Sequence, residues 1–209
     1  MISASDALAR LRDGNRRFVA VRSATTPLAS QVRRSELVAG QEPFAIILGC
    51  SDSRVPAELV FDQGFGDLFV IRVAGNIVAP SQIGSVEFAA ARFGTRLVVV
   101  LGHSQCGAIV ATLEELTGKA TTESKNLRSI VDRVRPAVED LLAGPHGDDS
   151  EVLIREAVLA NVRASVQQLR HGSELLERLT ETDGLLVVGA KYSLATGVVD
   201  FFKGAPDGR

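Results

Sequence analysis

The clearest structural signal in the chain is the run Leu97-Val98-Val99-Val100-Leu101-Gly102-His103, which is apolar and rich in β-branched residues as far as Gly102. A short apolar run of this kind is typical of a strand that is buried on both faces of a sheet. A second run, Phe44–Leu48, has the sequence FAIIL and ends at Gly49. Both runs predict buried strands, and each is followed by a glycine and a polar loop.

Helical and extended segments alternate along the rest of the chain. Leu8, Leu11 and Phe18 have helical spacing within residues 5–20, and Ser81 is expected to open a helix that ends at Phe93. Further helices are expected over residues 28–39, 108–116, 124–142 and 150–180, the last with a break at Gly172. A loop is expected over residues 144–149. Strands are expected over residues 68–73, 185–188 and 195–202. This alternation predicts an α/β fold with a mostly parallel sheet flanked by helices.

Composition places the chain among ordinary globular proteins. Apolar residues make up 45% and charged residues 23% of the 209 residues, and we expect residues 1–209 to form one domain. The net charge of −2 gives no reason to expect nucleic acid or an anionic membrane as a partner. Charges at Asp6 and Arg10 interrupt the N-terminal region, and no apolar run approaches the ~20 residues that span a bilayer. We therefore expect a cytoplasmic protein.

Potential metal ligands follow both buried strands. Cys50 comes directly after Gly49, and His103 and Cys106 come after the Leu97–Leu101 strand. If these strands are adjacent, the three side chains converge at the carboxyl edge of the sheet, where ligand sites of parallel sheets form. Zinc binds thiolate and imidazole, and three protein ligands leave a fourth position for water. A cysteine after a buried strand is often only a small apolar packing residue, but the combination predicts one catalytic zinc per chain.

Two motifs surround these ligands, Cys50-Ser51-Asp52-Ser53-Arg54 and His103-Ser104-Gln105-Cys106-Gly107. Together they resemble the β-class carbonic anhydrases. Further matching strings cover residues 66–70, 72–76, 84–88 and 188–192. The resemblance implies zinc-dependent, reversible hydration of carbon dioxide to bicarbonate and a proton. It also implies a homodimer, in some members a tetramer, with an N-terminal helical arm that embraces the partner subunit.

The family has two types of site, and the sequence favours one of them. One type has an active-site glutamine nine residues before the first cysteine, which is Gln41 here. The other has a regulatory bicarbonate pocket around a tryptophan three residues before that cysteine. That position is Ile47 here, and the chain has no tryptophan. The resemblance therefore implies that Gln41 donates to bicarbonate, although a polar loop residue before Pro43 is an equally good interpretation.

Four more residues are expected to bind substrate. Small, apolar carbon dioxide suits a narrow pocket lined by Phe69, Ala74 and Phe88. Phe88 stands where the family has a pocket tyrosine, so that hydroxyl is missing. The backbone N–H of Gly107, at the start of the helix after Cys106, is expected to face an anion.

Asp52 and Arg54 are the expected catalytic residues. Two residues apart in a tight turn, they can pair, and Arg54 would keep Asp52 ionised through charge-assisted hydrogen bonds. Asp52 would then accept a hydrogen bond from the nucleophilic hydroxide. If Arg54 released it, the carboxylate would instead fill the fourth position on zinc. The alternative is an ordinary surface ion pair worth ~0–1 kcal/mol.

Two other functions would use the same ligands. Hydrolysis of carbonyl sulfide or carbon disulfide needs the same zinc chemistry, and release of sulfide would distinguish it. A thiol redox or metal-sensing module would use Cys50 and Cys106, and it predicts reversible disulfide formation with loss of zinc. That module leaves Asp52 and Arg54 without a role.

Overall fold

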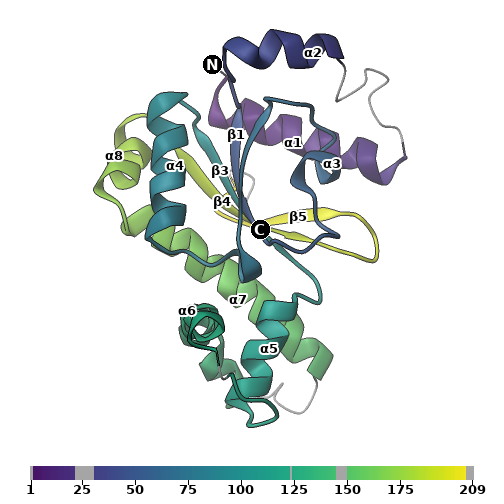
Figure 1. The fold of residues 1–209 in the computed structure, drawn as a ribbon, viewed down its shortest axis with the longest axis vertical. Coiled ribbons are helices and arrows are strands. Elements are labelled where there is room, and N and C mark those ends of the chain that lie inside the picture. Colours follow the sequence, from purple (N-terminus) through teal and green to yellow (C-terminus); the bar gives the residue numbers. More distant parts are fainter. Residues whose placement is uncertain (1, 22–30, 123, 145–149, 206–209) are drawn as a thin grey trace.

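The computed structural model describes residues 2–21, 31–122, 124–144 and 150–205, and its centre is a sheet in the order β2-β1-β3-β4-β5 (Figure 1). The strands are β1 Ala45–Gly49, β2 Leu68–Arg72, β3 Leu97–His103, β4 Leu186–Tyr192 and β5 Val199–Lys203. Strands β2, β1, β3 and β4 are parallel, and β5 runs antiparallel to β4. The predicted α/β fold with a mostly parallel sheet is confirmed.

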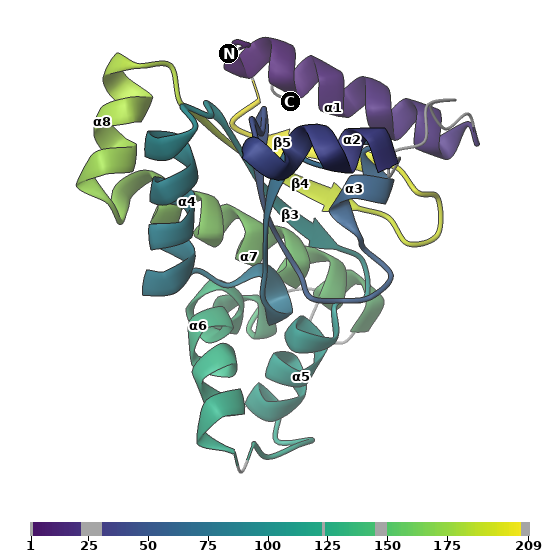
Figure 2. The same cartoon turned by 45° about the horizontal axis from the view of Figure 1, so that its top comes forward.

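Helices cover both faces of the sheet (Figures 1 and 2). One layer holds α1 Ala4–Val19 and α3 Ala57–Val60, and the other holds α4 Pro80–Arg92, α7 Ser150–His171 and α8 Glu174–Thr182. Beyond the sheet, α5 Gly107–Leu116 and α6 Lys125–Leu142 pack on α7. The short helices are α2 Gln31–Glu36, η1 Leu37–Ala39 and η2 Ala74–Asn76. Among the described helices, none has the length and apolar run that crossing a bilayer requires.

The two central strands contact both helical layers. Ile47 and Val99 face the layer of α1, while Ile46 and Val98 face the layer of α7, and all four are fully buried. A strand with two buried faces cannot show an alternating apolar and polar pattern. This is why β1 and β3 are continuous apolar runs in the sequence.

Helix α7 lies unusually close to the sheet because two strand residues have no side chain. A Cβ atom on Gly102 of β3 would lie 2.5 Å from Val162 Cγ2, and one on Gly189 of β4 would lie 2.9 Å from Val162 Cγ1. Any larger residue at these positions would push the helix outward. The close approach lets polar side chains of α7 reach the backbone near the carboxyl ends of the strands.

Among the element boundaries that differ from the sequence-based expectation, two have a local cause. Helix α4 begins at Pro80 with Ala79 as N-cap, and no side chain caps it, so the predicted opening at Ser81 is wrong. Proline is favoured at this first position because its missing N–H has no intrahelical partner there. The last strand begins at Val199 instead of 195, because the preceding residues form a turn in which Gly197 has a φ of 75° and donates to Ser193 O.

Two other predictions fall partly or wholly outside the described residues. Of the helix expected over 28–39, the structure describes α2 and η1 from residue 31 onward. Of the loop expected over 144–149, only Gly144 is described.

The N-terminal helix packs on its own chain. Ala7, Leu8 and Leu11 of α1 are buried in the core beside α3 and β3. Asn15 Nδ2 donates to Val60 O at 3.0 Å and to Gly197 O at 2.8 Å, and its Oδ1 accepts from the Val199 N–H. The apolar face of α1 is therefore used within the chain. Contact of its outer face with a partner subunit stays a prediction.

Candidate active site

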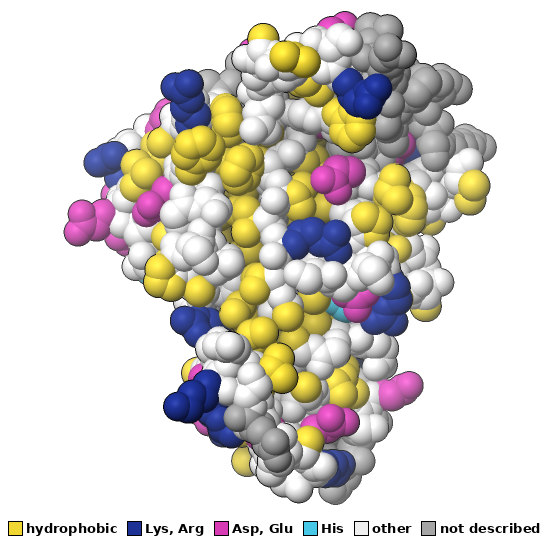
Figure 3. Space-filling view, viewed as in Figure 1, with side chains coloured by type: hydrophobic (Ala, Val, Ile, Leu, Met, Phe, Trp, Pro, Cys, Tyr) yellow, Lys and Arg dark blue, Asp and Glu magenta, His cyan; other side chains and the backbone are white. Residues whose placement is uncertain are grey.

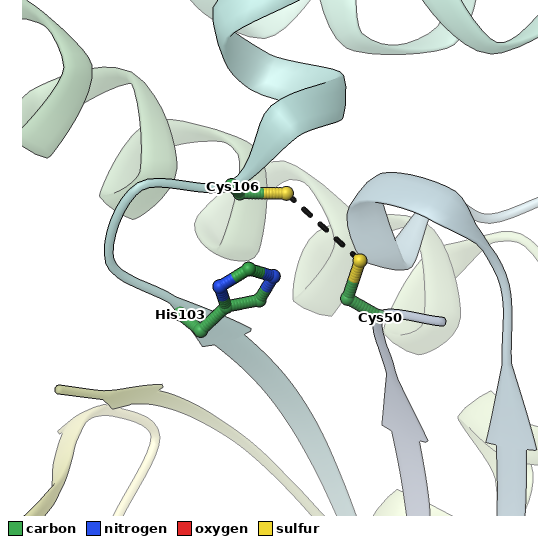
Figure 4. Close-up of side chains that lie close together, drawn as sticks. All are labelled: Cys50, His103 and Cys106. Atoms are coloured by element: carbon green, nitrogen blue, oxygen red, sulfur yellow. Dashed lines mark hydrogen bonds between the residues drawn. The ribbon is translucent and has the colours of Figure 1, made fainter. Parts of the chain in front are cut away.

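The predicted ligands meet where the strand order switches. Strand β1 pairs with β2 on one side and with β3 on the other, so the strand order switches between β1 and β3, the point at which parallel sheets bind their ligands. Cys50 follows β1, His103 is the last residue of β3, and Cys106 is the N-cap of α5. Figure 4 shows the three side chains pointing toward one another. All are buried, and their donor atoms lie within 4.8 Å of one another.

The geometry of these donors fits zinc. Two thiolates at about 2.3 Å from a tetrahedral zinc lie roughly 3.8 Å apart, and the Cys50 and Cys106 sulfurs are 3.9 Å apart. His103 Nδ1 lies 2.9 Å from Ser104 O, which can only accept, so Nδ1 carries the proton and Nε2 keeps its lone pair. Nε2 is buried without a hydrogen-bond partner among the described residues. A buried imidazole lone pair beside two thiols is a set of donors that suits a metal cation.

The contact between the two thiols moves their pKa values in opposite directions. The hydrogen bond from Cys106 lowers the pKa of Cys50 to about 4, against the opposing effect of burial, and the same contact raises the pKa of Cys106. Burial is the largest single effect and would lower the pKa of His103. The proximity of Cys50, the Ser104 carbonyl and the charge of Asp52 together outweigh burial and raise this pKa. A bound dication would favour thiolates at both cysteines and a neutral imidazole.

Asp52 lies beside this donor set, and Arg54 forms hydrogen bonds with its carboxylate. Arg54 Nε donates to Asp52 Oδ1 at 2.9 Å, Nη2 donates to Oδ2 at 2.7 Å, and the Arg54 backbone N–H donates to Oδ1. This side-chain contact holds the pKa of Asp52 well below its usual range. Asp52 Oδ2 is 3.8 Å from His103 Nε2. The predicted pairing is therefore present, and it aims an ionised carboxylate at the donor set.

Arg72 also contacts the site, and sequence reasoning gave it no role. Its Nε donates to Cys50 O at 3.0 Å, and its Nη2 donates to Asp52 O at 2.6 Å. It reaches both carbonyls because β2 pairs with β1 in a register that places Arg72 opposite Gly49. Nothing local in the sequence marks this contact; only the pairing of β1 with β2 would have indicated it.

Two of the expected substrate-binding residues lie at the donor set. Ala74 opens η2, whose next residue, Gly75, donates its N–H to Cys50 Sγ at 3.4 Å. Gly107 follows Cys106 directly, and a side chain there would meet no atom within 4 Å. Gly107 therefore borders open space at the start of α5.

The other three lie elsewhere in the same chain. Gln41 precedes β1, whose five residues at about 3.3 Å each put roughly 16 Å between it and Cys50. Phe69 pairs with Ile46 near the start of β1. Phe88 lies on α4, 53% exposed, with its ring centroid 6.1 Å from that of Phe69. One chain does not bring these three side chains to the donors.

A family model described as carbonic anhydrase matches residues 45–199, which include all three donors and Asp52. The chain belongs to the carbonic anhydrase family. Two mycobacterial relatives are similar over most of their length. The carbonic anhydrase of Mycolicibacterium smegmatis is 40% identical over 91% of this chain and 89% of the relative. Carbonic anhydrase 2 of Mycobacterium tuberculosis is 40% identical over 90% and 87%.

Solved carbonic anhydrase structures share the fold. The β-carbonic anhydrase CafA of Aspergillus fumigatus superposes with a TM-score of 0.74 at 25% identity, covering 96% of this chain and 91% of that one. The β-carbonic anhydrase CcaA superposes with a TM-score of 0.72 at 26% identity, covering 95% and 92%. The resemblance to the β class of carbonic anhydrases is confirmed.

Proposed function

We propose that this chain is a zinc-dependent carbonic anhydrase that interconverts carbon dioxide and water with bicarbonate and a proton. The observation that carries the proposal is the buried set of Cys50, His103 and Cys106, with ionised Asp52 aimed at it. The membership of the chain in the family and the names of its mycobacterial relatives support the choice of substrate.

Zinc bound by these three residues would supply a Lewis acid that lowers the pKa of a water molecule and makes it a nucleophile. Cys50 and Cys106, both as thiolates, would cancel the charge of the dication and weaken this effect compared with three histidines. The chain therefore needs a group that organises the nucleophile. Asp52 is the ionised side chain in the right place.

Asp52 would accept a hydrogen bond from the nucleophile. This bond would orient the nucleophile so that a lone pair on the nucleophile's oxygen is directed at carbon dioxide. Arg54 occupies both carboxylate oxygens of Asp52, which makes it a positioning residue. The Asp52 carboxylate is close enough to His103 Nε2 that, without the contact to Arg54, it could become a metal ligand itself. The Arg54 contact therefore favours the open state of the site.

We further infer that a second copy of the chain completes the substrate pocket. Gln41, Phe69 and Phe88 are too far from the donors of their own chain, yet Phe88 is exposed beside the edge strand β2. Apolar side chains gather over α4 and the adjoining part of the sheet in Figure 3. A homodimer that apposes this surface to the donors of the partner would bring the three side chains to carbon dioxide or bicarbonate.

Stopped-flow measurement of carbon dioxide hydration, run beside a zinc assay, tests the proposal. We expect about one zinc per chain and a hydration rate that falls to the background when a chelator removes the metal. A zinc-loaded protein that does not hydrate carbon dioxide would contradict the proposal. Release of sulfide from carbonyl sulfide or carbon disulfide by that same protein would identify the alternative hydrolase.

A further inference from the structure

Two buried polar side chains of α7 face the loop behind the donor set. Asn161 and Ser165 lie one helical turn apart and are 3% and 2% exposed. Asn161 Nδ2 donates to Gly75 O at 2.8 Å, and Ser165 Oγ donates to Asn76 O at 3.1 Å. Burying polar groups is unfavourable unless they are hydrogen-bonded. Both side chains use their bonds to hold the same two-residue turn.

The turn that they hold has an unusual backbone. Gly75 has a φ of 70° and Asn76 a φ of 43°, so two successive residues are left-handed, a conformation that glycine adopts freely and asparagine more readily than most other residues. A Cβ on Gly75 would lie 3.0 Å from Ala108 Cβ. In this conformation the Gly75 N–H is directed at Cys50 Sγ, 3.4 Å away. The turn thus places a hydrogen-bond donor on one of the predicted metal ligands.

We propose that Asn161, assisted by Ser165, is a positioning residue of the metal centre, because it holds the turn whose Gly75 N–H donates to the Cys50 sulfur. The inference rests on the proposed zinc site. Groups that orient a ligand from outside the coordination sphere fix its geometry and tune its donor strength. A hydrogen bond to a thiolate withdraws electron density from the sulfur, so this contact sets how strongly Cys50 donates to the metal.

Helix α7 can act in this way because it lies close to the sheet over Gly102 and Gly189. The short side chains of asparagine and serine then suffice to reach the backbone of the turn. The contact joins residues 86 and 89 positions apart in the sequence. It therefore links the metal centre to an element that contributes no ligand.

The test compares Asn161→Leu and Ser165→Ala with the wild-type zinc protein. Zinc release to an excess of a coloured chelator should be about 10-fold faster or more in Asn161→Leu, and faster to a smaller extent in Ser165→Ala, because the loss of ligand orientation outweighs the stronger donation by the sulfur. In the cobalt(II)-substituted proteins, the thiolate-to-metal charge-transfer band should move to longer wavelength, because sulfur that loses a hydrogen bond donates more readily. Ser165→Ala is the smaller change and serves if Asn161→Leu does not fold.

The matched control is Thr95→Val. Thr95 is 2% exposed and donates to Pro43 O at 2.7 Å, so it is also a buried side chain tied to a loop carbonyl, but at the other end of the sheet. Thr95→Val should lower the free energy of unfolding without changing the rate of zinc release or the cobalt spectrum. Unchanged release and an unchanged band in both α7 variants would overturn the role of Asn161 while leaving the zinc site intact. Wild-type protein that takes up no zinc would overturn the proposed function and this role together.

Discussion

At the scale of single residues, one backbone contact decides what His103 can do. The Ser104 carbonyl accepts from Nδ1, so the tautomer is set and Nε2 is left for a metal. The donors themselves could be predicted from sequence, because each follows a recognisable buried strand. Arg72 and Asn161 could not, because their contacts depend on strand register and on how closely α7 approaches the sheet.

Replacing one thiolate should remove the metal. Cys106→Ser puts a neutral hydroxyl in the place of a thiolate, which is a far poorer zinc ligand. We expect elemental analysis to find little zinc in this variant. Ser51→Ala, an exposed change beside Cys50, should keep about one zinc per chain and serves as control. Full zinc content in Cys106→Ser would exclude this residue as a ligand.

Removing the charge of Asp52 should stop turnover without removing zinc. Asp52→Asn has a similar shape but offers a donor where an acceptor is required, and loss of one preorganised partner typically lowers the rate by ~10²–10³. Hydration rates measured above the pKa of the nucleophilic water, beside zinc content, test this. Near-normal turnover would show that the pair with Arg54 is structural only.

Arg54→Ala should be equally damaging for a different reason. The substitution frees the Asp52 carboxylate, which then occupies the fourth coordination position of the zinc. Crystals of the variant should show an Asp52 oxygen about 2.0–2.2 Å from the metal. The double variant Asp52→Asn with Arg54→Ala should be strongly non-additive, because both changes act through one contact. Additive losses in the hydration rate would mean that the two residues act separately.

At the scale of elements, long periodic or continuously apolar segments were predictable and short ones were not. Strands β1 and β3 were evident because both of their faces are buried. Helix α3, Ala57–Val60, is too short to show a period, and no side chain caps it, so nothing in the sequence marked it. Strand β4 extends to Tyr192, four residues beyond its predicted end, because Gly189 interrupts the apolar run without interrupting the strand.

The packing of α1 on α3 depends on a glycine. A Cβ on Gly14 would lie 1.8 Å from Phe61 O, a backbone atom that cannot move aside. Gly14→Ala should therefore lower the free energy of unfolding by about 1–3 kcal/mol, as overpacking typically does. Gly84→Ala, in α4 with no atom within 4 Å of its added carbon, should instead raise it by about 0.5–1 kcal/mol. Chemical denaturation of both variants measures the contrast, and equal behaviour would contradict the close contact.

At the scale of the whole molecule, the proposed pocket requires two chains. Phe88→Asp places a charge on the surface that is expected to face the partner, so light scattering at micromolar concentration should show monomers of about half the wild-type mass. Hydration activity should fall with dimer content. Leu127→Asp is the control, since Leu127 is similarly exposed on α6, and this variant should remain dimeric and active. Wild-type protein that scatters only as a 22.2 kDa species would contradict the dimer.

The two edges of the sheet differ in a way that matters when the protein is handled. Strand β5 carries Asp200 and Lys203, charges that discourage pairing with a foreign strand. Strand β2 is uncharged from Leu68 to Ile71, and no described strand pairs with its outer side. Dissociation of the proposed dimer would expose this apolar edge to other molecules. Aggregation of dissociated or freshly synthesised chains should therefore begin at β2.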